Sequence, residues 1–437
     1  MERYAEYKDS GVEWVGNIPS HWKLKKLGYC GLLYGGLTGK SGEDFKTEDD
    51  KRNRDYVPYT NILRNTYISS THFDSVIIEE GEKQNRVHQF DLFFLMSSED
   101  YDDLGKSCVL LDPVDELYLN SFCKGFRVLL DSVSPVFLNY QLHGDVHRKL
   151  VSTEGRGFTR INLRQERLKD TPMFLPPVEE QERIVAFLDE RTGWIDEAVK
   201  KTEKKIALLK EQRASLINEV VTKGLDPNVE MQDSGVEWIG DIPSHWSVVK
   251  LQYLCSCSTG GRDTQDRIDN GEYPFFVRSP KIERIDTYSF DGEAVLTAGD
   301  GVGAGKVFHH FDGKFDFHQR VYKFSGFKNV IGRFFFLYMS TLFINVSENQ
   351  NAKSTVDSLR KPMLDSFPFA LPPVEEQRRI VAFLDERTGM MDEVIAKEEE
   401  RITLLKQYRQ SLISEVVTGK RKVFDEPLPL TCHAGTH

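Results

Sequence analysis

Glycine, histidine and charged residues suggest several reactive sites in this chain, but their spacing argues against most of them. The run Gly299 to Lys306 (GDGVGAGK) contains enough glycine to suggest a phosphate-binding loop. A P-loop requires glycine where Asp300 stands and Ser or Thr where Val307 stands. The β-like sequence after the run also argues against a loop that binds S-adenosylmethionine, which a helix should follow. We therefore interpret the run as a glycine-rich loop between strands, where the backbone can approach a binding partner closely.

Other catalytic patterns are equally incomplete. Glu203-Lys204-Lys205 has a nuclease-like spacing but lies inside a long helical pattern. His309, His310 and His318 have no acidic or cysteine partner at a typical metal-binding spacing. The sequence has no GxSxG nucleophile motif. Pro176-Pro177 lacks the polar and aromatic flanks of an adenine methyltransferase loop. The sequence thus predicts neither a catalytic residue nor a metal site.

Basic and amide side chains near predicted strand ends are the candidates for DNA binding. Arginine can read guanine with two hydrogen bonds, and Asn or Gln can read adenine. Most such residues in a complex contact only phosphate, and for each one the alternative is a solvated charge or a local ion pair. The candidates between about residues 24 and 174 are Lys40, Lys51, Arg52, Arg54, Asn61, Arg64, Arg156 and Arg160. Those between about residues 248 and 370 are Arg262, Arg267, Arg278, Lys281, Lys306, Gln319, Arg320 and Lys353.

Composition sets limits on these interpretations. A chain of 437 residues should form two or more domains. Its net charge of −11 requires basic residues to be concentrated locally if DNA is the ligand. Six scattered cysteines without a CxxC pair suggest reduced thiols in a cytoplasmic protein. The longest apolar stretch, Phe334 to Val346, is too short to span a membrane.

Two repeated motifs indicate the scaffold that positions these residues. Leu175 to Gly193 and Leu371 to Gly389 differ only at Glu182 and Arg378, and Asp9 to Trp22 is closely similar to Asp233 to Trp246. We expect the repeated Trp14, Trp22, Trp238 and Trp246 to be packing anchors. The segments between the repeats are unlike each other. The sequence therefore predicts one duplicated scaffold that carries two different modules.

Each LPPVEEQ motif predicts the start of a long helix, because proline and acidic residues suit a helix N-terminus. An apolar four-and-three spacing then runs for more than four heptads, which favours a coiled coil. Gly224 and Gly419 are expected to end the helices, and Gly193 and Gly389 to bend them. Each helix would be roughly 65 Å long and act as a spacer within an antiparallel pair. A wide apolar stripe also predicts a surface for docking partner helices, formed by Leu188, Ile195, Ile206, Leu209, Leu216, Leu384, Ile395, Leu405 and Leu412.

Both variable modules are expected to combine short strands with a following helix. In module one the pattern predicts strands at Tyr56–Ile62, Val76–Glu79, Leu92–Met96, Lys106–Leu111 and Cys123–Leu129, then a helix at Val136–Leu150. In module two it predicts strands at Tyr273–Arg278, Ala294–Thr297, Lys306–Phe308 and Phe315–Phe324, then a helix at Arg333–Asn345. A similar polar stretch precedes each long helix, at residues 156–160 and 349–355.

The duplicated DSGVEWIGxIPxHW motif and the duplicated PPVEEQ-x-RIVAFLDE helix start resemble the specificity subunit of type I restriction–modification systems over nearly the whole chain. GDGVGAGKVF followed by FDFHQRVYKF also resembles a recurrent target-recognition pattern. The resemblance implies that each module reads half of a split site in double-stranded DNA. It implies that the helices dock two methyltransferase subunits, that restriction subunits join them, and that this chain is not catalytic. S-adenosylmethionine, ATP and Mg²⁺ would then belong to the partners, and this chain would hold no cofactor.

The expected fold is α+β, with two α/β recognition domains joined by two long antiparallel coiled-coil helices in pseudo-twofold symmetry. The expected boundaries are 1–174 for the first recognition domain, 175–230 for the first helix, 231–370 for the second recognition domain, 371–423 for the second helix and 424–437 for a tail. Two alternatives stay open at this point. One is a coiled-coil scaffold that binds proteins and has no DNA specificity, and the other is an enzyme that both reads and modifies DNA.

Overall fold

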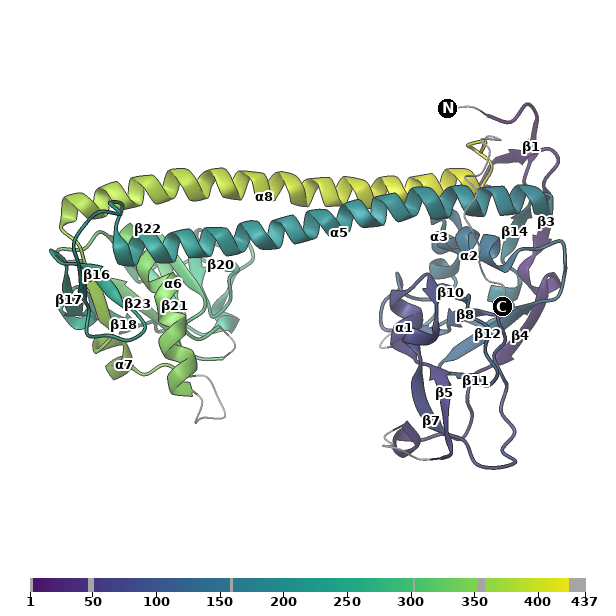
Figure 1. Ribbon diagram of the computed structural model, residues 1–437, viewed down its shortest axis with the longest axis horizontal. Coiled ribbons are helices and arrows are strands. Elements are labelled where there is room, and N and C mark those ends of the chain that lie inside the picture. Colours follow the sequence, from purple (N-terminus) through teal and green to yellow (C-terminus); the bar gives the residue numbers. More distant parts are fainter. Residues whose placement is uncertain (1–2, 46–50, 158–159, 302, 352–357, 424–437) are drawn as a thin grey trace. The chain divides into compact units, whose positions relative to one another are not determined.

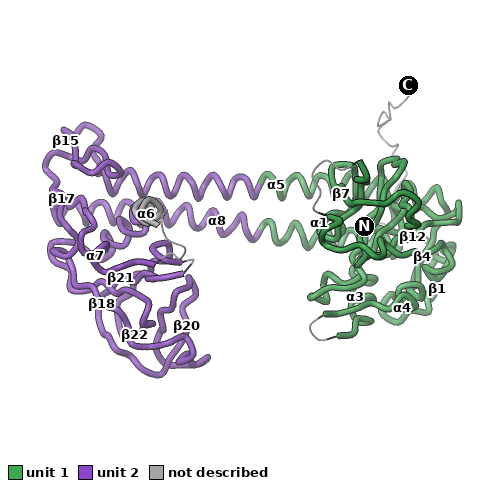
Figure 2. The backbone as a smooth tube through the Cα atoms, turned by 90° about the horizontal axis from the view of Figure 1, so that it is seen from below, with its two compact units in different colours: residues 1–201, 401–437 green, residues 202–400 purple. Residues whose placement is uncertain are grey.

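The structure is a computed structural model, and it describes residues 3–45, 51–157, 160–301, 303–351 and 358–423. The chain forms two compact units, unit 1 of residues 1–201 and 401–437 and unit 2 of residues 202–400 (Figure 2). The long helices α5 (Val178–Lys223) and α8 (Val374–Val417) each contribute one part to each unit. The α+β class with two long helices is confirmed, whereas the five expected boundaries stay a prediction.

Unit 1 holds module one, which is built on a five-stranded sheet in the order β4-β12-β8-β10-β6 (Figure 1). A three-stranded sheet has the order β11-β5-β7, and β3 pairs with β14. The strands are β1 (Tyr7–Asp9), β2 (Asn17–Pro19), β3 (Lys23–Lys26), β4 (Gly31–Gly35), β5 (Asn53–Val57), β6 (Tyr67–Ile68), β7 (Asp74–Ile77), β8 (Leu92–Leu95), β9 (Ser97–Ser98), β10 (Ser107–Leu110), β11 (Leu117–Leu119), β12 (Cys123–Val128), β13 (Ile161–Asn162) and β14 (Pro172–Leu175). The shorter helices are α1 (Tyr59–Arg64), α2 (Pro135–His143), α3 (Asp145–Thr153) and α4 (Gln165–Lys169), with 3-10 turns at Leu27–Tyr29, Gly42–Phe45 and Ser70–His72.

Unit 2 holds module two, whose six-stranded sheet has the order β18-β23-β21-β22-β19-β20. Its strands are β15 (Met231–Asp233), β16 (Asp241–Pro243), β17 (Ser247–Lys250), β18 (Ser256–Thr259), β19 (Tyr273–Phe276), β20 (Ile282–Ile285), β21 (Phe290–Ala298), β22 (Phe308–Phe317), β23 (Val321–Ser325) and β24 (Pro368–Leu371). Its shorter helices are α6 (Gly332–Asn351) and α7 (Lys361–Asp365), with 3-10 turns at Leu251–Tyr253 and Thr264–Asp266.

The two modules share a strand topology although their sequences differ. The first five strands of the module-two sheet follow the order of the module-one sheet, with β4, β12, β8, β10 and β6 matched by β18, β23, β21, β22 and β19. In both sheets the last of these pairings is parallel and the others are antiparallel. Equivalent positions in the two modules can therefore be identified from strand register.

The repeated motifs fasten each long helix to its module by the same contacts. Gln181 is fully buried and accepts a hydrogen bond from the Ser134 backbone at 2.8 Å, and Gln377 accepts one from the Ile331 backbone at 2.8 Å. One residue before each glutamine, Glu180 accepts from the buried Trp22 indole, and Glu376 accepts from the Trp246 indole. The expected anchor role holds for these two tryptophans but is wrong for Trp14, which is 54% exposed.

Within unit 2 the two long helices run antiparallel, as the partners of their charged side chains show. In unit 2, Lys205 pairs with Glu398 and Arg213 with Asp392. In unit 1, Arg409 pairs with Asp196. Both helices end where predicted, because Gly224 and Gly419 have φ angles of 75° and 72° that glycine tolerates best. Gly193 and Gly389 lie within unbroken helix.

Several boundaries within the modules differ from the prediction. Tyr56–Ile62 is not one strand: β5 ends at Val57, and α1 begins after Pro58, which favours a helix start. The strand expected at Lys306 begins at Phe308. Phe315–Phe324 belongs to two strands, because β22 and β23 lie on opposite sides of β21. The helix expected over 136–150 breaks at Gly144, where the Asp145 backbone donates to Ser414 of α8.

Candidate nucleic-acid interface

Module two brings two predicted DNA-binding arginines onto one carboxylate. Arg278 follows β19, and Arg320 lies in the turn between β22 and β23. Arg278 Nη1 donates to Asp300 Oδ1 at 3.0 Å, and Arg320 donates to the other oxygen. The Asp300 side chain is 12% exposed, whereas those of Arg278 and Arg320 are 44% and 62% exposed. Burial raises the pKa of Asp300, but the hydrogen bonds from Arg320 and Arg278 lower it by more, so the pKa lies below its usual value and the carboxylate stays ionised.

The glycine-rich loop allows this arrangement. A Cβ atom at Gly299 would lie 2.9 Å from the carbonyl oxygen of Arg320, and one at Gly303 would lie 2.7 Å from that of Arg278. Both distances are too short for a side chain. The loop connects β21 to β22, so no helix follows it, in agreement with our interpretation of a loop between strands. In the structure its glycines pack against the backbone of the two arginines.

A second buried carboxylate holds Arg262, another predicted residue. Arg262 Nε donates to Asp316 Oδ2 at 3.2 Å, and its Nη2 donates to Thr287 at 3.1 Å. Thr287 and Ser289 also donate to Asp316, which is 1% exposed. Both oxygens of Asp316 have hydrogen-bond partners. The guanidinium of Arg262 donates to Asp316 and to Thr287, and these two hydrogen bonds fix its direction.

Gln319 completes this group through the neighbouring Asp263 and His318. Gln319 Nε2 donates to Asp263 Oδ2 at 3.0 Å, and its backbone N–H donates to the Arg262 carbonyl at 2.7 Å. His318 accepts at Nδ1 from the Arg320 backbone N–H at 2.9 Å. Burial, together with nearby Arg278, lowers the pKa of His318, so the ring is neutral near pH 7. Arg262, Arg278, Gln319 and Arg320 therefore form one polar surface at this end of the sheet, the arginine surface of module two.

The other predicted residues of module two are placed differently. Arg267 and Lys281 both pair with Glu283 on β20, at 3.9 and 3.0 Å. Lys306 lies in the turn before β22, and Lys353 and most of the polar stretch at 349–355 lie outside the described residues. His309 contacts the Ser279 carbonyl, and His310 contacts Glu293. Among the described residues, no group of three or more His, Cys, Asp or Glu side chains could hold a metal ion.

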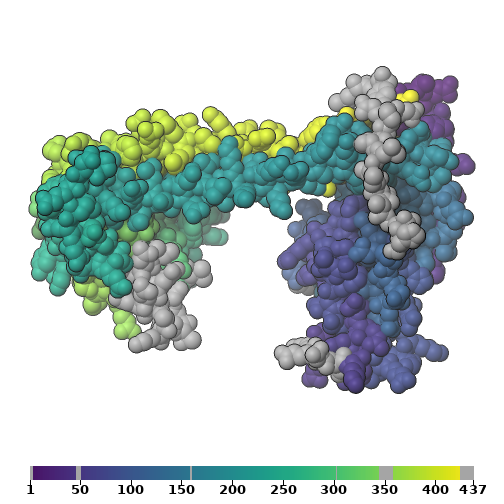
Figure 3. Space-filling view, viewed as in Figure 1, coloured from purple at the N-terminus to yellow at the C-terminus, as the bar shows by residue number. Residues whose placement is uncertain are grey.

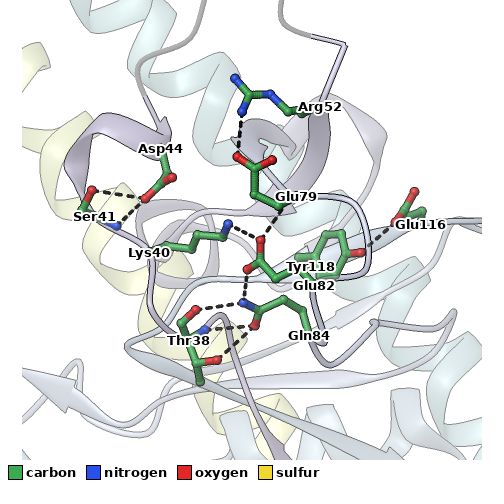
Figure 4. A network of polar contacts seen from close by, with 10 residues as sticks. All are labelled: Thr38, Lys40, Ser41, Asp44, Arg52, Glu79, Glu82, Gln84, Glu116 and Tyr118. Carbon is green, nitrogen blue, oxygen red and sulfur yellow. Dashed lines mark hydrogen bonds and ion pairs between the residues drawn. The ribbon is translucent and has the colours of Figure 1, made fainter.

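In module one, three predicted cations are paired with carboxylates in the network shown in Figure 4 and beside it. Lys40 contacts Glu82, Arg52 contacts Glu79 at 2.7 Å, and Arg54 contacts Glu116 at 2.8 Å. The Lys40 side chain is only 6% exposed, and its hydrogen bond lowers the pKa of Glu82 to about 2. Lys40 is therefore not presented as a surface contact; its ammonium group instead holds two loop segments together.

The remaining module-one candidates lie on separate elements. Asn61 lies in α1, where its amide donates to the His72 carbonyl at 2.6 Å, and Arg64 is exposed at the end of the same helix. Arg156 donates to backbone carbonyls at Thr153 and Gly155. Arg160 lies over the exposed ring of Phe122, with 4.8 Å from its guanidinium carbon to the ring centre. Unlike Arg278 and Arg320 of module two, these residues do not share one carboxylate.

Sequence reasoning missed the carboxylates that organise these arginines. In module one, Asp91 accepts two hydrogen bonds from Arg127 and one from Tyr34, and its side chain is 2% exposed. In module two, Asp300 and Asp316 have the same role for predicted arginines. An aspartate inside a glycine run was the one available signal, because little else explains a charge there.

Most of the predicted docking residues are buried, several of them in the cores that the long helices share with the modules. Leu188, Ile195, Ile206, Leu384, Ile395 and Leu412 are buried, and Leu209, Leu216 and Leu405 are partly buried. The apolar side chains exposed on the same helices are Trp194, Leu208, Met390, Val394, Leu404 and Tyr408. Within unit 2, side chains of α5 and α8 lie against each other, and the outer faces of both helices reach the surface (Figure 3). A docking role for the buried leucines stays a prediction.

No helix in the described part of the chain is long and apolar enough to cross a membrane. Glu203-Lys204-Lys205 lies within α5, and Lys205 pairs with Glu398 across the helix pair. The nuclease-like spacing is thus part of a charged helix face.

The chain matches the family model described as "Type I restriction modification DNA specificity domain" over residues 19–208 and 243–404. It is 30% identical over 183 residues to the type I restriction enzyme EcoDI specificity subunit of Escherichia coli, covering 41% of this chain and 40% of that protein. It is 23% identical over 452 residues to the putative type I restriction enzyme MjaX specificity subunit of Methanocaldococcus jannaschii, covering 97% and 99%. A chain from a solved structure on complex assembly and conformational transition of the type I R-M system has the same fold, with a TM-score of 0.69, 18% identity and coverage of 92% and 99%.

Proposed function

The chain belongs to the type I restriction–modification DNA specificity family, and we propose that it reads a two-part, asymmetric DNA site with one module for each part. DNA sequence recognition is the activity of that family. One observation supports the two-part proposal: the two modules share a strand topology but present different polar side chains. Different surfaces on one framework should select different base sequences.

The two long helices would set the distance between the two half-sites. Both are unbroken, with 46 residues in α5 and 44 in α8. At 1.5 Å per residue, helices of this length extend for about 65–70 Å. Recognition from one face of the duplex favours half-sites separated by whole helical turns of about 34 Å. The base pairs between the half-sites would then be counted by helix length and not read.

Methylation and cleavage would be carried out by partner subunits. The resemblance implies two methyltransferase subunits and additional restriction subunits, which would bring S-adenosylmethionine, ATP and Mg²⁺. The candidate surface of this chain contains arginines, glutamine and carboxylates, which suit DNA reading. The methyltransferase subunits would extrude the target adenine for methyl transfer.

DNA binding by the assembled complex, measured as a function of salt, tests this proposal against a protein scaffold without DNA specificity. We expect the complex to bind its preferred duplex roughly 10³-fold or more tightly than a scrambled duplex at physiological salt. Equal affinity for both duplexes would support the scaffold instead. Transfer of labelled methyl groups by the isolated chain would support the third alternative, an enzyme that also modifies DNA.

A further inference from the structure

The turn after the central strand closes in the same way in both modules but carries different side chains. Gly105 in module one and Gly305 in module two both have φ of 66°, and each precedes a lysine. The Gly105 N–H donates to the Leu95 carbonyl, and the Gly305 N–H donates to the Ala298 carbonyl. Each turn thus closes back onto the end of the equivalent strand, β8 or β21.

A short bridge next to this turn identifies the counterpart of Asp300. Asn162 pairs with Ser97 in module one, and Ser358 pairs with Asp300 in module two. One residue further along, the Leu163 N–H donates to Met96 and the Leu359 N–H donates to Gly299. Ser97 therefore occupies in module one the position that Asp300 occupies in module two.

The counterpart of Arg320 follows from the neighbouring strand. Cys123 pairs with Leu95 at the start of β12, and Val321 pairs with Ala298 at the start of β23. The residue before each of these is Phe122 in module one and Arg320 in module two. The same two framework positions thus carry serine and phenylalanine in one module and an ion pair in the other.

We propose that Asp300 is a specificity-determining positioning residue that holds Arg278 and Arg320 so that both read guanine in the half-site of module two. This inference rests on the proposed function. One carboxylate oxygen faces each guanidinium, and both guanidiniums remain partly exposed with further N–H donors. Guanine offers its O6 and N7 acceptors in the major groove, which suit the paired donors of arginine.

The shared carboxylate explains why these arginines would read bases and not only phosphates. An unrestrained arginine samples many rotamers and can turn toward any phosphate oxygen. Asp300 fixes the direction of each guanidinium and reduces the local charge of the pair from +2 to +1. Gly299 and Gly303 are required for this geometry, because larger residues would strike the backbone of the same two arginines. In module one, Ser97 and Phe122 cannot form this pair, so its half-site must be read by other contacts.

An Asp300→Asn substitution in the complete complex tests the proposal. The probe is a library of duplexes randomised over the half-site of module two, and the control is Asp291→Asn, which removes the same charge from an exposed residue at the other end of β21. We expect Asp300→Asn to lower discrimination for guanine by roughly tenfold to hundredfold at the affected base pairs. Recognition of the other half-site should be unchanged, and binding to random DNA should be equal or stronger because one negative charge is lost. The control should keep wild-type discrimination.

Three results would overturn the proposal: wild-type discrimination in Asp300→Asn, equal loss at both half-sites, or loss confined to base pairs without guanine. Should Asp300→Asn fail to fold, Arg320→Lys decides, because this exposed substitution keeps the charge but removes the paired donors. Retained guanine discrimination in Arg320→Lys would then be contradictory. A wild-type complex that prefers no sequence would instead refute the proposed function itself.

Discussion

The paired glutamines of the repeated motif lead to a prediction in which each unit serves as the control for the other. Gln377 is fully buried, donates to the carbonyl oxygens of Asn329 and Pro372 at 2.9 and 2.8 Å, and accepts from the Ile331 backbone at 2.8 Å. A Gln377→Met substitution keeps the volume but leaves three backbone groups without this partner, of which the Pro372 carbonyl is buried and the other two are partly buried. An unpaired buried group costs about 1–3 kcal/mol, so unit 2 should lose at least about 1 kcal/mol.

Hydrogen exchange measured by mass spectrometry is the suitable assay, because a chain with two units need not unfold in one step. Gln377→Met should accelerate exchange in α6 and β24, and leave α2 and β14 of unit 1 unchanged. Gln181→Met should do the reverse, because Gln181 donates to Ser132 and Pro176 and accepts from Ser134 in the same way. Equal destabilisation of both units by either variant, or a loss below about 1 kcal/mol, would refute this reasoning.

Three further predictions concern pH, partner docking and spacing. Burial lowers the pKa of His143 and of His147 to about 4, so the folded state resists protonation of both rings. The free energy of unfolding of unit 1 should therefore fall by about 3 kcal/mol per histidine as the pH falls from about 6.5 to 4. His147→Gln should make this free energy less dependent on pH, as measured by denaturation curves at several pH values. Leu208→Asp combined with Leu404→Asp should weaken partner binding in gel filtration without unfolding the chain, because both side chains are about half exposed. Leu412→Asp should instead destabilise unit 1 itself, because Leu412 is buried. Full assembly of the double variant would exclude Leu208 and Leu404 as a docking surface. Inserting one heptad into both α5 and α8 adds about 10 Å of helix. The gap between the half-sites, measured by methylation mapping, should then lengthen by about three base pairs. An unchanged gap would count against a spacer role for the helices.

The long helices were predictable because their signals are local. Proline and glutamate at the start, an apolar heptad spacing and glycine at the end act within a few residues of each other. The repeat also allowed the two copies to be compared within one chain. Helix ends at Lys223 and Val417 therefore agree with the predicted stops.

The interior of the modules was harder to predict because distant contacts decide it. Phe315–Phe324 has the alternation of one strand, but it crosses the end of β21 and forms two. The apolar pattern around Gly144 is helical, yet the end of α8 packs there and the helix breaks. The local sequence does not show that β21 lies beside the first segment or that α8 packs against the second.

The candidate site was predictable in residue type but not in organisation. Arginines that follow strands were identified in both modules, and four of the predicted residues gather in module two. The sequence could not show that Asp300 and Asp316 hold them, because strand register brings these residues together from separate segments. It also could not show that Lys40 is buried in an ion pair with Glu82, because the two residues lie on loops 42 residues apart in the sequence.

Exchange of a single module tests the central claim most directly. Module one, from about residue 24 to 174, would be replaced by the corresponding segment of another family member, and genome-wide methylation would be mapped in cells that supply the methyltransferase subunits. We expect one half of the methylated sequence to change while the other half and the gap stay the same. A change in both halves, or in neither, would contradict independent reading by two modules.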